Sequence, residues 1–320
     1  MSGPANVQEL IARADRGDRR ALARLITMVE VAGEGARRVT TALHPRSGSA
    51  AIVGLTGAPG AGKSTLTDIL VGAIRARDER VGVLAIDPTS PFTGGAILGD
   101  RVRMQDRATD DAVFIRSMAS RGHLGGLALA TPHAARVLDA IGYPWVLIET
   151  VGVGQAEVEI AGHADTTVVV LNPGWGDGIQ AAKAGLMEIA DVFVVNKADR
   201  PGVRETVRDV EGMLDLAGDR PWRPPVIETI ASEGFGVEAA LDAICDHRRH
   251  LVATGLLELR RRRRTADEIR SIVVDTVGRR AAQRCSGPEF DELVASVAAR
   301  TSDPYRASDH LLGDDVASAP

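Results

Sequence analysis

A predicted phosphate-binding loop is the clearest chemical signal in this sequence. The segment GAPGAGKST, residues 57–65, fits the pattern G-x-x-x-x-G-K-[ST] without deviation. Its glycines let backbone N–H groups converge on phosphate oxygens, and the next helix adds a positive N-terminus. Lys63 reaches the outer phosphates, and the Ser64 hydroxyl can ligate Mg²⁺. The residues expected to bind the nucleotide phosphates are Gly57, Gly60, Gly62, Lys63, Ser64 and Thr65.

A second motif selects the base. The tetrapeptide NKAD, residues 196–199, follows an apolar run downstream of the phosphate loop. An aspartate placed there accepts hydrogen bonds from N1–H and the N2 amino group of guanine, and adenine lacks both donors. The backbone N–H of Ala231, just past the next apolar run, could reach the guanine O6. We therefore predict guanine recognition by Asn196, Lys197, Asp199 and Ala231.

Acidic and switch residues lie between these two motifs. Asp87 and Asp100 are candidates for the Mg²⁺ shell, directly or through water, although each could instead cap a turn or pair with an arginine. The segment ETVGVGQAE, residues 149–157, stands where P-loop GTPases carry D-x-x-G. Glu149 could act on the metal through water, and Gly152 could offer its N–H to the γ-phosphate. Gln155 could orient the attacking water or simply face solvent.

These interpretations define the predicted site. The predicted catalytic residues are Lys63, Asp87, Glu149, Gly152 and Gln155, and the predicted metal ligands are Ser64, Asp87 and Asp100. Loss of γ-phosphate contacts on hydrolysis would release the loops that hold them.

Two further loops are rich in glycine, at residues 116–128 and 172–183. Trp175 lies between two glycines in the second, and an exposed aromatic on such a loop suggests a partner surface. A Trp packed inside the protein is an equally good interpretation. His123 in the first loop is better explained as a structural histidine than as a catalytic one.

The elements that must position these residues alternate between apolar runs and helical stretches. Continuous β-branched runs predict strands buried on both faces of a parallel sheet. Ligands of such sheets bind at the carboxyl ends of the strands, where every motif above lies. The predicted strands are Ala51–Thr56, Val81–Asp87, Val113–Arg116, Trp145–Thr150, Thr167–Leu171, Val192–Asn196 and Val226–Thr229. The fold class is therefore α/β, a P-loop NTPase domain with a mostly parallel central sheet flanked by helices.

Helical extensions are expected at both ends of this domain. Apolar residues recur at helical spacing within residues 7–43, and residues 251–300 read as two long helices broken near Ser286 to Pro288. We predict an N-terminal extension at 1–47, a GTPase domain at 48–250 and a C-terminal helical segment at 251–320. That last segment could be a helical cap on the sheet or an oligomerisation (dimerisation) arm, because long helices without a core need something to pack on. The arginine run at 260–264 would spread over all faces of a helix, exposed to solvent or to an acidic partner.

Composition narrows the class of protein. The chain has 320 residues, a net charge of −5 and 44% hydrophobic residues, which suits a globular protein and disfavours nucleic acid or an anionic membrane as partner. No apolar run is long enough to span a bilayer, and the N-terminus resembles no signal peptide. Two separated cysteines indicate a reducing compartment. We expect a cytoplasmic, bacterial protein.

The motifs together strongly resemble the MeaB/ArgK GTPases. The resemblance rests on GAPGAGKST, DPTSPFTGGAILGDRVRM, RSMASRGHLGGLA, ETVGVGQAE, the Gly-Trp-Gly-Asp-Gly loop, NKAD and the DPYRASDHLL ending at Leu312. It implies a homodimer joined by C-terminal helices, GTP/GDP and Mg²⁺ as cofactors, and the roles given above for the site residues. It also implies a chaperone of an adenosylcobalamin-dependent acyl-CoA mutase, chiefly methylmalonyl-CoA mutase, with the 172–183 loop as a partner-responsive switch. Any cobalamin would belong to the partner.

Two other functions stay open from the sequence. A transport-linked ATPase or kinase would require ATP preference, which NKAD disfavours. A metal-delivery GTPase would need softer ligands than two separated cysteines, and the seven histidines are scattered.

Overall fold

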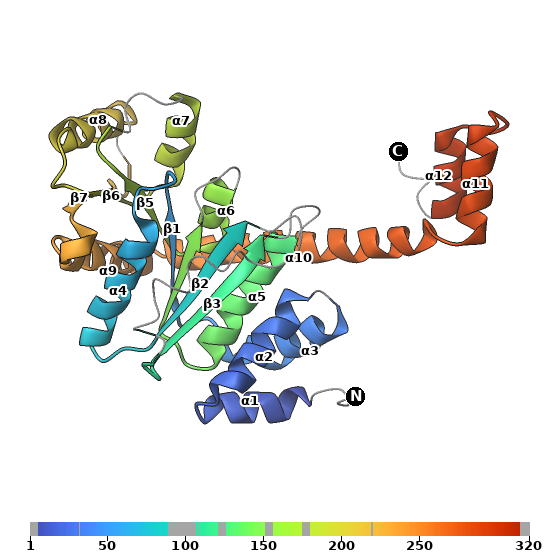
Figure 1. Ribbon diagram of the computed structural model, residues 1–320, viewed down its shortest axis with the longest axis horizontal. Helices are drawn as coiled ribbons and strands as arrows, with labels where there is room; N and C mark the ends of the chain where they lie inside the picture. The colour runs from blue at the N-terminus through green and yellow to red at the C-terminus, as the bar shows by residue number, and fades with distance from the viewer. Residues whose placement is uncertain are drawn as a thin grey trace. The chain divides into compact units, whose positions relative to one another are not determined.

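The computed structural model describes residues 6–31, 33–88, 107, 109–120, 126–150, 156–174, 180–218 and 220–313 (Figure 1). The chain divides into two compact units, Met1–Arg264 and Thr265–Pro320. The three sequence segments 1–47, 48–250 and 251–320 remain a prediction about domain organisation. In the part of the chain that the structure describes, no helix is long and apolar enough to cross a membrane.

A seven-stranded sheet forms the centre of the first unit. Its order is β3-β2-β4-β1-β5-β6-β7, and all its pairings are parallel. The strands are β1 (Ala51–Thr56), β2 (Val81–Pro88), β3 (Val113–Ser120), β4 (Trp145–Thr150), β5 (Thr166–Leu171), β6 (Val192–Asn196) and β7 (Val226–Thr229). All seven predicted strands are confirmed, and β3 runs four residues further than its apolar run. The α/β fold class is confirmed.

Helices cover both faces of the sheet. Alternate residues of each strand point to opposite faces, so Val53 and Leu55 pack with α4 (Lys63–Ala76) and α9 (Val237–Ala253). The other face packs against α5 (Gly126–Ala140), α6 (Ala156–His163), α7 (Gln180–Ile189) and α8 (Val203–Leu216). Two-sided burial explains why the strands read as continuous apolar runs.

The N-terminal extension is a packed helical layer. Its helices are α1 (Val7–Asp15), α2 (Arg19–Glu30) and α3 (Glu34–Leu43), and α2 and α3 contact α5. Asn6 and Asp18 cap the first two helices by accepting backbone N–H groups with their side chains. The apolar residues that predicted these helices form their buried faces: Val7, Leu10, Ile11 and Ala14, then Leu22, Leu25, Ile26 and Val29.

The C-terminal helices are α10 (Leu256–Arg284), α11 (Pro288–Ala298) and α12 (Pro304–Leu312). The predicted break is confirmed, because α10 ends just before Ser286 and Pro288 begins α11. In the second unit, the Arg284 guanidinium donates to the carbonyls of Leu311 and Leu312 at the end of α12. Neither α10 nor α11 has a buried residue, so these helices form no core of their own.

The arginine run divides between its two predicted roles, exposure to solvent and contact with acidic groups. Three of its members, Arg260, Arg261 and Arg264, pair with Asp165 and Asp191 of the same unit, at 2.9, 2.7 and 2.5 Å. We call Arg260, Arg261 and Arg264 the α10 arginine cluster. Its partners lie 69 to 99 residues upstream, so no local pattern revealed them. Arg262 and Arg263 are exposed, which is the other predicted role.

This cluster predicts a fall in stability in acid. Burial raises the pKa of Asp165, but the Arg261 hydrogen bond and the charges of Arg264 and Arg261 lower it more. For Asp191, burial likewise raises the pKa, and His247 and Arg260 lower it more. Both folded pKa values therefore lie below the unfolded value of about 4, so this stabilisation is present above pH 4 and is lost as pH falls through the folded pKa. We expect the urea-derived unfolding free energy to drop between pH 5 and pH 3.

A matched variant isolates Asp165 from the other carboxylates. The unfolding free energy of Asp165→Asn should be lower than that of the wild type at pH 7, and the difference between the two unfolding free energies should become smaller toward pH 3. A difference that stays constant with pH would contradict the assignment.

Candidate nucleotide-binding site

The phosphate loop connects β1 to α4 and is shaped by three glycines. Gly57, Gly60 and Gly62 have φ of 132°, 75° and 96°, a region that residues with a Cβ rarely adopt. A Cβ on Gly57 would lie 2.0 Å from the Val170 carbonyl oxygen. The loop therefore passes against β5, which explains why the motif requires glycine at its first position.

Lys63 lies folded over the loop. It is 6% exposed, and its ammonium donates to the carbonyls of Gly57 at 2.6 Å and Ala58 at 3.0 Å. Lys63 begins α4, so its charge lies where backbone N–H groups and the helix N-terminus would hold a phosphate. Thr65 follows in the first turn of the same helix.

Ser64 and Glu149 meet at the carboxyl ends of β1 and β4. The Ser64 hydroxyl donates to the Glu149 carboxylate at 2.5 Å, and Glu149 is only 4% exposed. Two hard oxygen donors side by side suit Mg²⁺, which prefers carboxylate and hydroxyl oxygens and keeps several waters. This donor pair therefore fits the Mg²⁺ ion that the sequence predicted. The direct contact between Ser64 and Glu149 could not be predicted from the sequence.

Asn196 joins the guanine motif to the phosphate loop. Its amide donates to the Ala61 carbonyl at 2.9 Å, while its oxygen accepts from Thr229 Oγ1 at 3.1 Å and from the Ala231 N–H at 3.0 Å. The Ala231 N–H, predicted to reach guanine O6, is thus engaged by Asn196 in this structure. Recognition of O6 by Ala231 remains a prediction, and it would require sharing that N–H.

Lys197 and Asp199 complete the described part of this edge. Lys197 has φ of 62° and donates to the Gly60 carbonyl at 2.6 Å, which closes a second link between the two loops. The Asp199 carboxylate is exposed and has no hydrogen-bond partner among the described residues. It follows Lys197, which contacts the phosphate loop, by two residues, and its exposure leaves it accessible to a base.

Several predicted residues lie outside what the structure describes. Asp100, Gly152, Gln155 and Trp175 fall outside the described ranges. Asp87 lies in β2, paired in register with Ala119, and only its backbone is described. The structure thus brings together the phosphate loop, Glu149 and the NKAD loop, and their roles in catalysis remain predictions.

Thr229 is a site residue that the sequence analysis missed. It is fully buried and orients Asn196 through a hydrogen bond. The available signal was its place at the end of β7, beside the end of β6 in the sheet.

An all-parallel sheet with this phosphate loop after β1 and this Asn-Lys-x-Asp loop after β6 defines the class of P-loop GTPases. The family model "Methylmalonyl Co-A mutase-associated GTPase MeaB" matches residues 22–286, and the chain belongs to this family. The protein is a GTPase.

Several known proteins are similar to this chain along most of its length. A protein of Pyrococcus abyssi named as a GTPase is 51% identical, over 97% of each chain. GTPase ArgK of Escherichia coli is 37% identical over 84% of each chain. A mouse protein named "Methylmalonic aciduria type A homolog, mitochondrial" is 37% identical over 65% of this chain and 52% of its own. The solved structure of an LAO/AO transport system kinase superposes with a TM-score of 0.69 at 28% identity, covering 98% of each chain.

Proposed function

We propose that this GTPase is Mg²⁺-dependent and acts as a chaperone of an adenosylcobalamin-dependent acyl-CoA mutase, methylmalonyl-CoA mutase first. It would gate cofactor loading and protect the mutase. The observation that carries the proposal is the family match over residues 22–286, whose description names association with that mutase. The name of the mouse relative, which refers to methylmalonic acid, supports the same partner.

The proposed chemistry follows from the nucleotide site. A Mg²⁺ ion held by Ser64 and, directly or through water, by Glu149 would neutralise charge on the β- and γ-phosphates. Lys63 would hold the outer phosphates in place. Asp87 and Asp100 are proposed to complete the metal shell, with Gly152 and Gln155 at the γ-phosphate and the attacking water. Cobalamin would be bound by the mutase alone.

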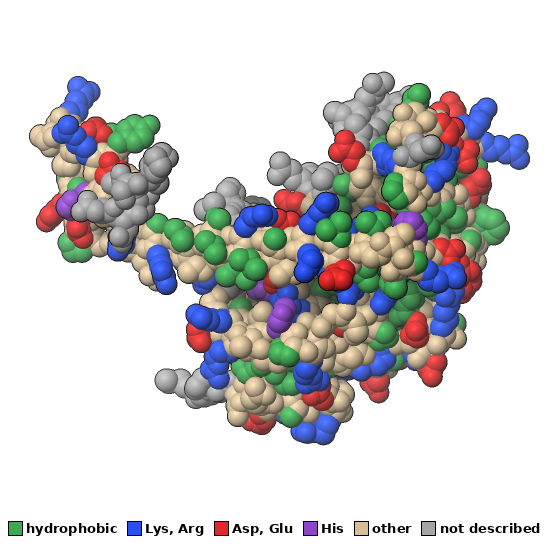
Figure 2. All heavy atoms as spheres, turned by 180° about the vertical axis from the view of Figure 1, so that it is seen from behind, with side chains coloured by type: hydrophobic (Ala, Val, Ile, Leu, Met, Phe, Trp, Pro, Cys, Tyr) green, Lys and Arg blue, Asp and Glu red, His purple; other side chains and the backbone are tan. Residues whose placement is uncertain are grey.

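A homodimer is proposed from the second unit. Ile269, Val273 and Val277 recur every fourth residue along α10, and all three are exposed. Figure 2 shows hydrophobic side chains along this helix. An apolar stripe of this kind is costly in water and suits a second copy of the same helix. We propose the cytoplasm as its location, since Cys245 and Cys285 are both free thiols.

The test is GTP turnover with and without the organism's methylmalonyl-CoA mutase, beside an ATP control. Light scattering on the sample without the mutase gives the mass of the GTPase, which should be that of a dimer. We expect the mutase to accelerate turnover of GTP and not of ATP, because a partner can supply or order transition-state contacts that the isolated protein lacks. GTP turnover indifferent to this mutase would reject it as the client.

Neither alternative function is favoured by the site. The LAO/AO transport system kinase shares the fold, but the Asn196–Asp199 motif is suited to guanine and gives no reason for ATP preference. A metal-delivery role lacks support among the described residues, which contain no group of three or more His, Cys, Asp or Glu that could hold a metal ion.

A further inference from the structure

Two buried carboxylates join three neighbouring strands at the edge opposite the nucleotide site. Asp165 and Asp191 come immediately before β5 and β6, and they are 2% and 6% exposed. β1, β5 and β6 are adjacent in the sheet. Each carboxylate accepts a backbone N–H from the neighbouring strand, Asp165 from Ile52 at 3.3 Å and Asp191 from Thr167 at 2.9 Å. These two side chains therefore take part in the pairing of β1, β5 and β6.

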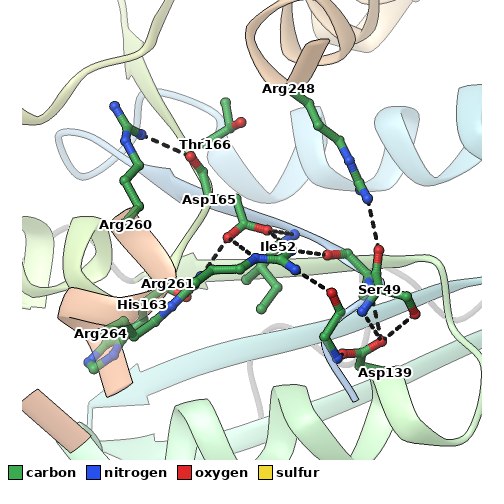
Figure 3. A network of polar contacts seen from close by, with 12 residues as sticks. Ser49, Ile52, Asp139, His163, Asp165, Thr166, Arg248, Arg260, Arg261 and Arg264 are labelled. Atoms are coloured by element: carbon green, nitrogen blue, oxygen red, sulfur yellow. Dashed lines mark hydrogen bonds and ion pairs between the residues drawn. The ribbon is translucent and has the colours of Figure 1, made fainter. Parts of the chain in front are cut away.

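The α10 arginine cluster supplies the opposite charge for both carboxylates. Figure 3 shows Asp165 with Arg261 and Arg264. Arg261 contacts the two oxygens of Asp165 at 3.2 and 2.7 Å, and Arg264 adds a contact of 2.5 Å. Arg260 contacts both oxygens of Asp191, at 3.0 and 2.9 Å. Two parallel N–H···O bonds fix position as well as charge. The first turns of α10 are thus held against the amino ends of β5 and β6.

Arg261 also contacts the segment that leads into β1. Arg261 donates to the carbonyls of Gly48 and Ala50, at 2.8 Å for Ala50, just before β1 begins. From the other side, the Asp139 carboxylate accepts backbone N–H groups from this segment, including that of Ala50 at 2.9 Å. Figure 3 shows the side chains of Asp139 and Arg261 both directed toward the segment that contains Ser49. Arg261 therefore contacts the amino ends of both β1 and β5.

The carboxyl ends of these strands carry the nucleotide site. β1 leads into the phosphate loop, and β6 ends at Asn196. Across that edge, Asn196 and Lys197 bond to Ala61 and Gly60 at 2.9 and 2.6 Å, so the spacing of the two loops depends on how β1, β5 and β6 lie. The two edges are roughly 15–20 Å apart, the length of a five- to six-residue strand.

We propose that Arg260 and Arg261 are positioning residues for guanine nucleotide binding. Acting through Asp191 and Asp165, they set the relative placement of β1, β5 and β6, and so the distance between the phosphate loop and the NKAD loop. Without them, Asp165 would keep Arg264 as its cationic partner and Asp191 would keep only its 3.2 Å contact with His247. Each carboxylate would lose its guanidinium paired to both oxygens, and the strands that share those carboxylates would adjust. By linkage, a nucleotide that bridges the two loops stabilises the contacts of α10 in return. The inference rests on GTP binding alone and not on the identity of the client.

The run of arginines contains its own controls. Arg262 and Arg263 stand between the cluster members on the same helix and are exposed. The described contact of Arg262 is a 3.8 Å ion pair with Glu258, one turn earlier on α10. Replacing Arg262 and Arg263 with methionine removes the same charge from the same helix and leaves the strands untouched.

The decisive variant is Arg260→Met with Arg261→Met, compared with Arg262→Met with Arg263→Met. Affinity for fluorescent GDP and for a non-hydrolysable GTP analogue is measured well below each unfolding midpoint. We expect the first pair to weaken both affinities about tenfold, a typical coupling within one ion-pair network, and the control pair to leave them unchanged. Wild-type affinity in the folded Arg260→Met, Arg261→Met protein would overturn the proposal.

A second measurement needs no variant and distinguishes positioning from a merely structural role. Amide hydrogen exchange of residues 256–264 in the wild-type protein should slow when GDP or the GTP analogue binds, although these residues contact the edge of the sheet opposite the predicted nucleotide site. Arg260→Lys, which keeps the charge but cannot pair with both carboxylate oxygens in parallel, should reduce this protection. Exchange in 256–264 that is indifferent to nucleotide would overturn the proposal, even if the methionine variants do not fold. Neither measurement involves the mutase.

Discussion

Replacing Lys63 with alanine should reduce GTP turnover by about 10²–10³-fold, the usual cost of removing one preorganised donor from a developing negative charge. Lys63 lies buried at the start of α4, with its ammonium on the carbonyls of Gly57 and Ala58. A phosphate group bound in the loop would give this charge a stronger partner than two carbonyls, because the new contact joins opposite charges. Phosphate release at saturating GTP measures the effect.

The control for this variant is Arg24→Ala. Arg24 is an exposed cation on α2, a helix that packs mainly against α1, α3 and α5. It should turn over GTP at the wild-type rate. Because Lys63 makes contacts within the loop, the unfolding midpoint of Lys63→Ala must be measured beside its activity. Turnover within a few fold of wild type in a folded Lys63→Ala protein would exclude this loop as the site of hydrolysis.

Exchanging Asp199 for asparagine should convert the base preference from guanine to xanthine. The amide cannot accept two hydrogen bonds from N1–H and the N2 amino group, so GTP affinity should fall by roughly a hundredfold. Xanthosine triphosphate, which carries a carbonyl where guanosine has the amino group, should gain affinity because the amide can donate to it. Competition between the two nucleotides for one labelled ligand gives both values.

Replacing Asp199 should change base recognition without changing the stability of the fold. It is exposed and has no hydrogen-bond partner among the described residues, so its replacement should leave the unfolding midpoint unchanged. The control is Asp209→Asn, which removes one negative charge from an exposed aspartate on α8. If Asp199→Asn kept wild-type GTP affinity, the guanine assignment of the NKAD loop would be wrong.

The sequence predicted the fold because its signals are local. Continuous apolar runs such as Val192–Asn196 reflect strands buried on both faces, and glycine spacing in residues 57–65 reflects a backbone shape that other residues rarely adopt. Neither depends on residues far away in the chain. For the same reason the strand ends were predicted less well than the strands: β3 continues to Ser120 through Arg116, which bonds to Glu30 on α2.

The contacts within the site could not be predicted, because they join residues far apart in sequence. Ser64 and Glu149 are 85 positions apart, and only the sheet order, which places β4 beside β1, brings them together. The bond from the Ala231 N–H to Asn196 has the same origin. The arginine run was interpreted from its own composition, whereas its partners are aspartates that precede β5 and β6. An acidic residue at the entrance to a buried strand was the available signal.

The α10 arginine cluster also has a consequence for the response of the protein to heat. The hydration of charged groups becomes less favourable as temperature rises, so the cost of keeping Asp165, Asp191 and their arginines out of water declines on warming. Stabilisation from apolar burial levels off over the same range. As the protein warms, the ion pairs at the amino ends of β1, β5 and β6 should therefore contribute a larger share of the free energy of unfolding. Thermal unfolding should begin in parts of the first unit that depend on apolar packing alone.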